Sequence, residues 1–204
     1  RSSVDLLVVS HYHADHANGI PQLLRRLDVG QIALPDVERD SPLRAEILAA
    51  AEKKGIRILF VREKAEFGGV EEGFITVFPP MMEEGTVNEL GLTVLAAHGT
   101  LDVLITGDME REGELRLVET VSLPEVEVMV AGHHGSDTST TPELLEAVKP
   151  GLALISVGQN NKYGHPDWDT LVRLEEIGAD IYRTDLYGTI EVQMKQEDHY
   201  AAKK

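Results

Sequence analysis

The sequence predicts an α/β fold, and two observations carry that prediction. Short apolar runs rich in β-branched residues, typical of buried strands, alternate along the chain with amphipathic segments that have the spacing of helices. Polar clusters of His, Asp and Gly follow directly after several of these apolar runs. Loops that follow the strands of such a sheet lie along one edge, so we expect these clusters to share a crevice. A length of 204 residues suffices for a well-buried core, and residues 1–204 are expected to form one domain.

The first half of the chain alternates predicted strands and helices. The run from Val4 to Val9 is short, continuous and β-branched, as in a buried strand. Because proline is tolerated only in the first turn of a helix, Pro21 indicates a helix from about residue 17 to residue 27. Residues 42–54 have apolar residues at helical spacing and end at Gly55, a common helix stop. The remaining segments are expected to be strands at 31–35, 56–61 and 74–78, turns and an exposed edge over 62–73, and a loop over 79–85.

The second half continues the alternation. Residues 90–97 and 101–106 flank His98-Gly99 and predict a hairpin. Thr141-Pro142 is a favourable N-cap and first-turn pair for a helix that runs to about Val148. The other expected elements are helices at 110–120 and 167–177, strands at 126–131, 152–157, 180–183 and 189–194, a polar loop at 159–166, and a frayed tail from Lys195.

Composition limits the classes of function. The formal charge is -16, from 19 basic and 35 acidic residues, so a whole-surface basic footprint for nucleic acid is absent. A phosphate substrate remains compatible with this charge, because bound dications reverse the local field at a site. The absence of cysteine excludes disulfides and Cys-ligated zinc. No apolar run approaches the roughly 20 residues needed to cross a bilayer, and the chain begins at Arg1, so we expect a soluble piece of a longer protein.

The most informative stretch is Ser10-His11-Tyr12-His13-Ala14-Asp15-His16, directly after the first strand. Imidazole and carboxylate at this density are ligands for divalent metals such as zinc. His11 and His13 project to the same side of an extended segment, whereas Asp15 and His16 are placed to serve a second ion. Asp108, after the strand at 101–106, is the natural carboxylate to bridge two ions, or alternatively a helix cap. A chance surface cluster and a purely structural metal are the alternatives for the whole group.

Further candidates lie in the loops of the second half. One histidine of the pair His133 and His134 is expected to bind metal, and we assign that role to His134. The other is expected to donate a proton or to hold a phosphate. The alternative for each is a buried histidine in the core. Ser136 and the hydroxyls at 138–141 bind phosphate or cap a helix. His165 is expected to contact substrate or support a ligand. His98 is expected to lie at the surface. Trp168 is expected to pack in the core or cap a helix, and the alternative is that it stacks on a base.

Together these motifs resemble a known family. His11 to His16 with Gly107-Asp108 resemble the metallo-β-lactamase superfamily. Four later segments are similar to the C-terminal domain of ComEC-type DNA-uptake proteins, and they lie in the same order at residues 105–110, 131–136, 155–166 and 182–188.

The resemblance implies a four-layer αββα sandwich with two divalent ions, manganese or zinc, at the strand-edge crevice. It implies the ligands His11, His13, Asp15, His16 and Asp108, paired histidines at 133 and 134, and an equivalent of Asn88 before the central hairpin. It also implies a parent protein with a transmembrane channel, working with other DNA-uptake components, and a domain on the extracytoplasmic face of a bacterial plasma membrane.

Three features of this sequence depart from the family pattern. Histidine stands at position 13, where the ComEC pattern commonly has aspartate, which supports a complete metal site. The isolated histidine usual between the first motif and Asp108 has no clear equivalent unless Asn88 or His98 replaces it. The family's opening strands are missing, so one sheet is expected to have an exposed edge.

The leading hypothesis is a dinuclear metal-dependent phosphodiesterase that cleaves one strand of incoming DNA through a metal-bound hydroxide. In it, Asp15 orients the water, His133 or His134 assists the leaving oxygen, and Asn88, Ser136 and His165 contact substrate. The alternatives are a metallo-hydrolase of another substrate, such as RNA, a phosphocholine ester or a lactam, and a non-catalytic domain that binds DNA or a partner.

Overall fold

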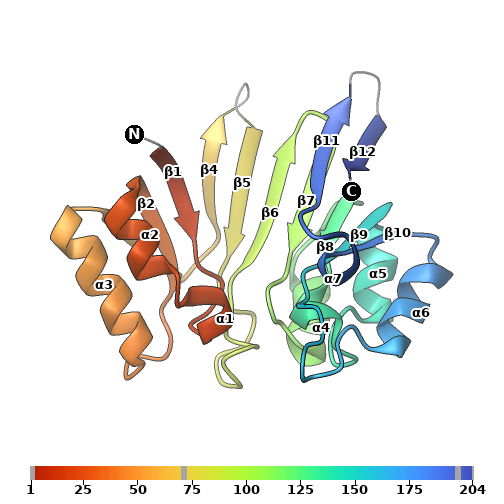
Figure 1. Ribbon diagram of the computed structural model, residues 1–204, viewed down its shortest axis with the longest axis horizontal. Coiled ribbons are helices and arrows are strands. Elements are labelled where there is room, and N and C mark those ends of the chain that lie inside the picture. Colours follow the sequence, from red (N-terminus) through yellow and green to blue (C-terminus); the bar gives the residue numbers. More distant parts are fainter. Residues whose placement is uncertain (1–2, 70–72, 196–198, 204) are drawn as a thin grey trace.

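The computed structural model describes residues 3–69, 73–195 and 199–203. Two β-sheets pack face to face, and helices cover the outer side of each sheet, so the molecule has four layers (Figure 1). This arrangement confirms the predicted α/β class and the αββα sandwich.

The first sheet is parallel and has the order β1-β2-β3. Parallel neighbours need crossover connections, which here are helices on the outer face. The apolar stripes of those helices and the sheet enclose one core, in which Leu24, Ile32 and Ile47 are fully buried. The elements are β1 (Ser3–Val8), α1 (Ala14–Ala17), α2 (Ile20–Arg26), β2 (Asp28–Pro35), α3 (Pro42–Lys54) and β3 (Arg57–Val61).

The second sheet has seven strands in the order β10-β9-β8-β7-β6-β5-β4. Strands β4 to β7 form an antiparallel meander, and β7 to β10 are parallel, with helices α4, α5 and α6 over them. The core beneath these helices includes Leu104, Met129 and Leu144, all fully buried. The elements are β4 (Ala65–Gly69), β5 (Gly73–Phe78), β6 (Thr93–His98), β7 (Leu101–Ile105), α4 (Arg111–Thr120), β8 (Val128–Val130), the 3₁₀ turn η1 (Gly132–Gly135), α5 (Pro142–Val148), β9 (Leu152–Ile155), α6 (Trp168–Glu176), β10 (Asp180–Arg183) and α7 (Thr184–Tyr187).

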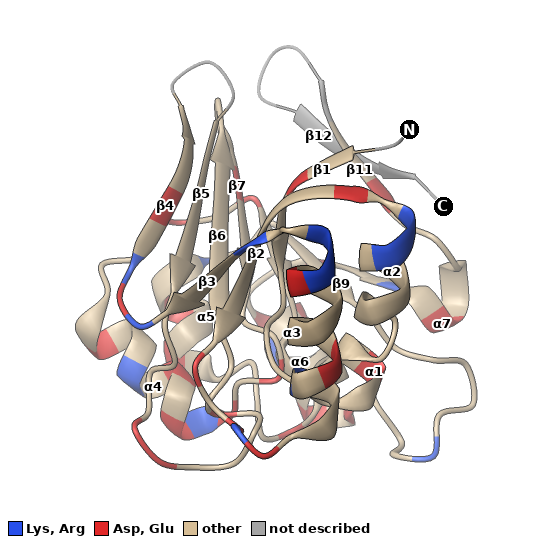
Figure 2. Cartoon of the chain, turned by 90° about the vertical axis from the view of Figure 1, so that its left-hand side faces the viewer, with Lys and Arg blue, Asp and Glu red and all other residues tan. Residues whose placement is uncertain are grey.

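The inner faces of the two sheets meet in a smaller core around Ala33, Val61, Val77 and Leu92. β1 pairs only with β2, so the strand that opens the described chain is an edge of its sheet, as expected. No helix in the described residues is long and apolar enough to span a bilayer. In Figure 2 basic and acidic residues are interspersed along the helices that face the viewer, α2 and α3.

Three sequence predictions need correction. The helix expected at 17–27 is two helices, α1 and α2, because the chain turns at Asn18-Gly19 before Pro21 begins α2. The segment 62–73, expected to form turns and an exposed edge, does lie at the edge of its sheet, but it contains the regular strand β4; residues 70–72 lie outside the described residues. The tail is not frayed where it is described, because β12 (His199–Lys203) pairs with β11 (Glu191–Lys195). Positions 196–198 and 204 of that tail lie outside the described residues.

The fold brings four loops together at one edge of the sandwich, at the bottom of Figure 1. These loops follow β1, β7, β8 and β9. Two backbone hydrogen bonds join the loop after β1 to its neighbours, from Val9 N to Ala33 O (3.0 Å) and from Leu92 N to Ser10 O (2.9 Å). The polar clusters that follow the strands in the sequence therefore meet in space.

Candidate metal centre and adjoining cavity

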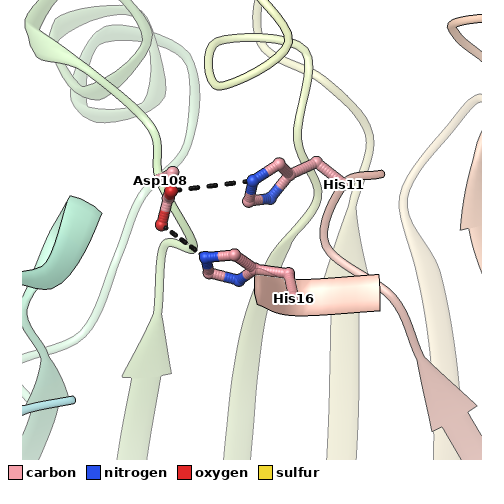
Figure 3. A group of neighbouring side chains, drawn as sticks. All are labelled: His11, His16 and Asp108. Carbon is pink, nitrogen blue, oxygen red and sulfur yellow. Dashed lines mark ion pairs between the residues drawn. The ribbon is translucent and has the colours of Figure 1, made fainter. Parts of the chain in front are cut away.

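The first metal motif spans the end of an extended segment and the short helix α1. The carbonyl of His13 accepts hydrogen bonds from His16 N (3.1 Å) and Ala17 N (2.9 Å), which starts the helix. Asp15 and His16 therefore lie on a helical turn rather than in the loop that the sequence predicted. This turn directs His16 towards Asp108, beside the buried ring of His11 (Figure 3).

Asp108 is the centre of the site. Its Oδ2 atom lies 3.6 Å from His11 Nε2, and its Oδ1 atom lies 3.2 Å from His16 Nε2 (Figure 3). The same carboxylate is 3.9 Å from His133 Nε2 and 3.8 Å from His134 Nε2. One buried carboxylate thus faces four imidazole nitrogens from two separate loops, the one after β1 and the one after β8, as expected for a residue that bridges two ions.

Gly107 allows this convergence. Its φ of +64° is left-handed, and a Cβ there would lie 3.1 Å from the Cβ of Ser10. A side chain at this position would be strained in itself and would also press on the loop that leads to His11. The close backbone approach holds Asp108 against the first metal motif.

The loop that carries His133 and His134 is strained. Both residues have left-handed backbone conformations, with φ of 48° and 57°, which are uncommon outside glycine. Hydrogen bonds hold the loop, from His133 N to Gly107 O (3.0 Å) and from Gly132 N to Thr140 Oγ1 (3.2 Å). Strain of this kind, fixed by its surroundings, is typical of functional sites.

The donor set fits a cation. His134 Nδ1 donates a hydrogen bond to the carbonyl of Ser156 (2.7 Å), which leaves its Nε2 as the lone-pair atom. That Nε2 faces Asp15 Oδ2 at 3.4 Å and Asp108 Oδ2 at 3.8 Å. His11 Nε2 is buried without a hydrogen-bond partner in the described structure. Electron-rich atoms this close repel one another unless a proton or a metal cation lies between them.

Two groups of three residues have ligand atoms within 4.8 Å of one another. The first group is His11, His16 and Asp108, and the second is Asp15, His16 and His134. His16 belongs to both groups through an atom that binds only one ion, so a pair of ions would depend on the two oxygens of Asp108.

The site's electrostatics keep His11 and Asp108 in the forms that bind a cation, whereas a cation at His16 would compete with a proton. Burial, aided by the nearby His16, lowers the pKa of His11 to about 4, so this imidazole is neutral at pH 7. Burial opposes the shift at His16, but its hydrogen bond with Asp108 and the charge of that carboxylate raise its pKa. Burial is the largest single effect on Asp108 and opposes the shift, but the hydrogen bond with His16 and the charges of the neighbouring histidines together lower its pKa, so the carboxylate stays ionised.

His13 and Asn88 lie beside the centre, outside the two groups. The ring of His13 is exposed and meets that of His11 edge-on, with centroids 4.9 Å apart, so its role as a ligand stays a prediction. Asn88 is buried and donates a hydrogen bond to Glu110 Oε1 (3.1 Å), with His133 Nε2 3.5 Å away. Glu110 also lies 3.8 Å from His133 Nδ1. Sequence reasoning missed Glu110, whose only signal was a carboxylate two residues after Asp108.

Three other candidates have clear positions. Ser136 is buried, and its hydroxyl bonds with Asp137 and Thr138, while Thr141 caps α5; this favours the capping interpretation over phosphate binding. His98 is exposed at the far end of β6, ~16 Å along the strand from the end nearest the site, so it does not replace the missing histidine. Trp168 is 72% exposed at the start of α6, so packing in the core was wrong.

A cavity of about 360 Å³ adjoins the second group of ligands. It shares Asp15 and His134 with that group, and His165 lies in its wall. Burial, with the nearby His133 and His134, lowers the pKa of His165. The full lining is Asp15, His134, Ser156, Val157, Gly158, Asn161, Tyr163, His165 and Thr184. A molecule in this cavity would lie against the candidate metal ligands.

Residues 1–159 match the family model of the metallo-β-lactamase superfamily, and the chain belongs to this superfamily. Membership of this superfamily defines the class of the chain and suggests a metal-dependent hydrolase.

Within that class, the similar curated proteins confirm the resemblance to ComEC-type proteins. The chain is 29% identical to ComE operon protein 3 of Bacillus subtilis over 94% of its own length. It is 30% identical to competence protein ComA of Neisseria gonorrhoeae over 92% of its length, and 28% identical to recombination protein 2 of Haemophilus influenzae over 95%. It spans only about a quarter of each relative, at 25%, 25% and 23% of their lengths respectively.

Solved structures of distant sequence share the fold. CmlA, a diiron β-hydroxylase from Streptomyces venezuelae, superposes with a TM-score of 0.62 at 17% identity, covering 90% of this chain and 44% of CmlA. Zn²⁺-bound PqqB from Methylobacterium extorquens gives a TM-score of 0.50 at 12% identity, covering 88% and 71%.

Proposed function

We propose that residues 1–204 are one domain of a longer DNA-uptake protein and that this domain hydrolyses phosphodiester bonds in DNA with two divalent cations. The single observation that carries the proposal is that Asp15 and His134 belong both to a group of candidate ligands and to the wall of the cavity. A phosphodiester bound in the cavity would therefore meet the cations directly.

The residues proposed to hold the cations are His11, His16, Asp108, Asp15 and His134, with His13 as a further ligand. Manganese and zinc both suit this set of imidazoles and carboxylates. When bound, the cations would supply Lewis acidity and neutralise charge on the phosphate oxygens.

The chain's own side chains have separate tasks in this proposal. Asp15, whose side chain is 61% exposed at the cavity, orients the attacking water. His133 donates the proton to the leaving oxygen, with Glu110 and Asn88 beside its ring to orient it. His134 is less suited to that task, since its Nδ1–H is engaged by Ser156 O and its Nε2 faces the carboxylates. His165, in the cavity wall, contacts the substrate.

The choice of DNA rests on the relatives, one of which is named a competence protein and another a recombination protein. This similarity supports a competence-related function. We further propose a transmembrane channel in the same parent protein, other DNA-uptake proteins as partners, and a position on the extracytoplasmic face of the plasma membrane. The formal charge of -16 repels a polyanion, so DNA would depend on the cations for local attraction.

The test is incubation of single-stranded and duplex DNA with the purified protein and manganese, zinc or magnesium. We expect cleavage that chelation abolishes and that Asp15→Ala and Asp108→Ala each remove. The control Asp40→Ala changes an exposed carboxylate outside the site and is expected to retain full activity. No cleavage above the level of the two site variants would overturn the nuclease proposal.

A second candidate is a non-catalytic domain that binds DNA or a partner protein, favoured by the exposure of His13 outside both ligand groups. The net acidity favours a partner protein over DNA as its ligand. Elemental analysis separates the two. Protein that takes up no metal after dialysis against manganese or zinc would support the binding domain, and a panel of other phosphoesters and lactams would test the other hydrolase substrates.

A further inference from the structure

Tyr163 is an exposed aromatic side chain in the wall of the cavity. Its ring is 70% exposed, although tyrosine ordinarily buries much of its apolar surface. It lies nearly parallel to the ring of His165, with centroids 5.9 Å apart and an interplanar angle of 15°. The ring of His165 in turn lies 5.7 Å from that of His133, so a short row of rings leads from the cavity to the candidate metal centre.

The loop that presents Tyr163 is fixed by one asparagine. Asn161 donates hydrogen bonds to the carbonyls of Gly158 (3.2 Å) and His165 (2.7 Å), and its Oδ1 accepts from Tyr163 N (3.2 Å) and His165 N (3.0 Å). Because these four bonds hold the loop before any ligand arrives, little conformational entropy is lost when a flat group stacks on Tyr163.

Lys162 adds a positive charge at the same place. Its Nζ atom lies 4.9 Å from the centre of the Tyr163 ring, and the residue is exposed. Such a contact between exposed groups is weak, so a flat ligand can displace the ammonium from the ring. The ammonium would then be free to pair with an anionic group next to that ligand.

A flat aromatic group joined to an anion, with the anion within reach of a metal-dependent phosphodiesterase, describes a nucleotide in a chain. Exposed aromatic rings with nearby cations are also the elements with which proteins bind unpaired nucleic acid. Bases in a duplex already stack on one another and present no free face, whereas bases in a single strand do.

We propose that Tyr163 is the stacking platform for one unpaired base of the DNA and that Lys162 pairs with an adjacent phosphate, so that the site selects single strands over duplex. This inference rests on the proposed function and specifies its substrate. His165, on the metal side of the ring, sets the distance between the stacked base and the scissile phosphate.

The experiment compares three substrates: a short oligodeoxythymidine, an oligonucleotide of equal length whose sugars carry no bases, and a duplex. The variants are Tyr163→Phe, which keeps the ring, and Tyr163→Ala, which removes it. Trp168→Ala is the matched control, since Trp168 is as exposed as Tyr163 (72%) but does not line the cavity. One measurement is KM for cleavage with manganese. The second is the binding affinity of fluorescein-labelled oligonucleotides by anisotropy, with manganese and with chelator, which requires no cleavage.

Wild type and Tyr163→Phe are expected to bind the thymidine strand more tightly than the base-free strand. Tyr163→Ala is expected to lose about 5- to 150-fold in affinity for the thymidine strand, with little change for the base-free strand. Trp168→Ala should behave as wild type. Equal affinity of wild type for both strands, or an equal loss in Trp168→Ala, would overturn the platform.

The two proposals fail differently. If no substrate is cleaved but the preference for bases persists in anisotropy and disappears in Tyr163→Ala, the platform stands and the nuclease proposal falls. If DNA is cleaved and the base-free strand is cleaved with the same KM, the nuclease proposal stands and the platform falls.

Discussion

The carboxyl group of Glu114 provides a test of how the loop with His133 and His134 is held. This residue of α4 is fully buried, and its two oxygens accept the backbone N–H groups of Thr140 and Thr141 at 2.7 Å each. Burial favours the neutral acid and the two hydrogen bonds favour the carboxylate. Burial is the larger effect and raises the pKa of Glu114 from 4.5 to about 7.

This pKa has a consequence for stability. The folded state holds the proton of Glu114 more tightly than the unfolded state, so the free energy of unfolding falls as the pH rises from 4.5 through 7, and it levels off above that. The difference between the two pKa values corresponds to roughly 3 kcal/mol in total, of which about 2.5 kcal/mol falls between pH 5 and pH 8.

The assay is urea denaturation followed by circular dichroism at pH 5 and pH 8, in chelator, for wild type, Glu114→Gln and the control Glu112→Gln. Glu112 is an exposed carboxylate on the same helix. Between the two pH values, wild type and the control are expected to lose about 2.5 kcal/mol more than Glu114→Gln. Titration of His11 raises the free energy of unfolding as the pH rises, because its pKa is lowered in the folded state. This contribution is common to all three proteins and cancels in the comparison. An equal pH dependence in wild type and Glu114→Gln would contradict a raised pKa of Glu114. A wild type that gains stability relative to the variant between pH 5 and pH 8 would mean that the two hydrogen bonds outweigh burial.

Three further predictions follow from the site and its supports. Wild type is expected to gain about 2.7 kcal/mol of stability at a manganese concentration 100 times its Kd. Asp108→Asn is expected to gain almost nothing, because it lacks the carboxylate shared by four imidazoles, whereas the control Asp40→Asn keeps the gain. Thermal denaturation with and without metal measures the gain, and an undiminished gain in Asp108→Asn would contradict the prediction. Gly107→Ala is expected to lower the free energy of unfolding in urea by roughly 1–3 kcal/mol, because of its left-handed φ and the nearby Ser10 Cβ. The control Gly19→Ala, at a φ of −78° with open space around it, is expected to lose nothing. Equal losses in the two variants would argue against the close approach of Gly107 to Ser10. Asn161→Ala is expected to lose roughly 1–3 kcal/mol and to speed proteolysis of the loop at 158–165, whereas Gln159→Ala leaves both unchanged; an intact loop in Asn161→Ala would contradict the account.

Much of the fold could be predicted because local patterns and tertiary structure agree. The continuous apolar run of β1, the Thr141 cap and the Gly55 stop each fix an element, and all are found in the structure. The split between α1 and α2 was missed because the polar segment around Asn18 is compatible with a helix. β4 was missed because Ala65–Gly69 has little apolar pattern and depends on pairing with β5.

The site could be predicted where candidate ligands lie close together in the sequence or directly after a strand. His11 and His16 come together with Asp108 because strand ends share one edge, which is a property of the topology. Glu110 and the row of rings through Tyr163 were not predicted, since each depends on contacts between distant loops. The hydroxyl of Ser136 makes local turn bonds that sequence alone does not reveal, and its contact with phosphate stays a prediction.

The most direct test of the cation pair is anomalous X-ray diffraction from crystals grown with manganese. We expect two anomalous peaks, both within bonding distance of Asp108, one beside His11 and the other beside Asp15 and His134. Crystals of the whole chain that contain millimolar manganese but show no anomalous peak at these side chains would contradict the cation pair.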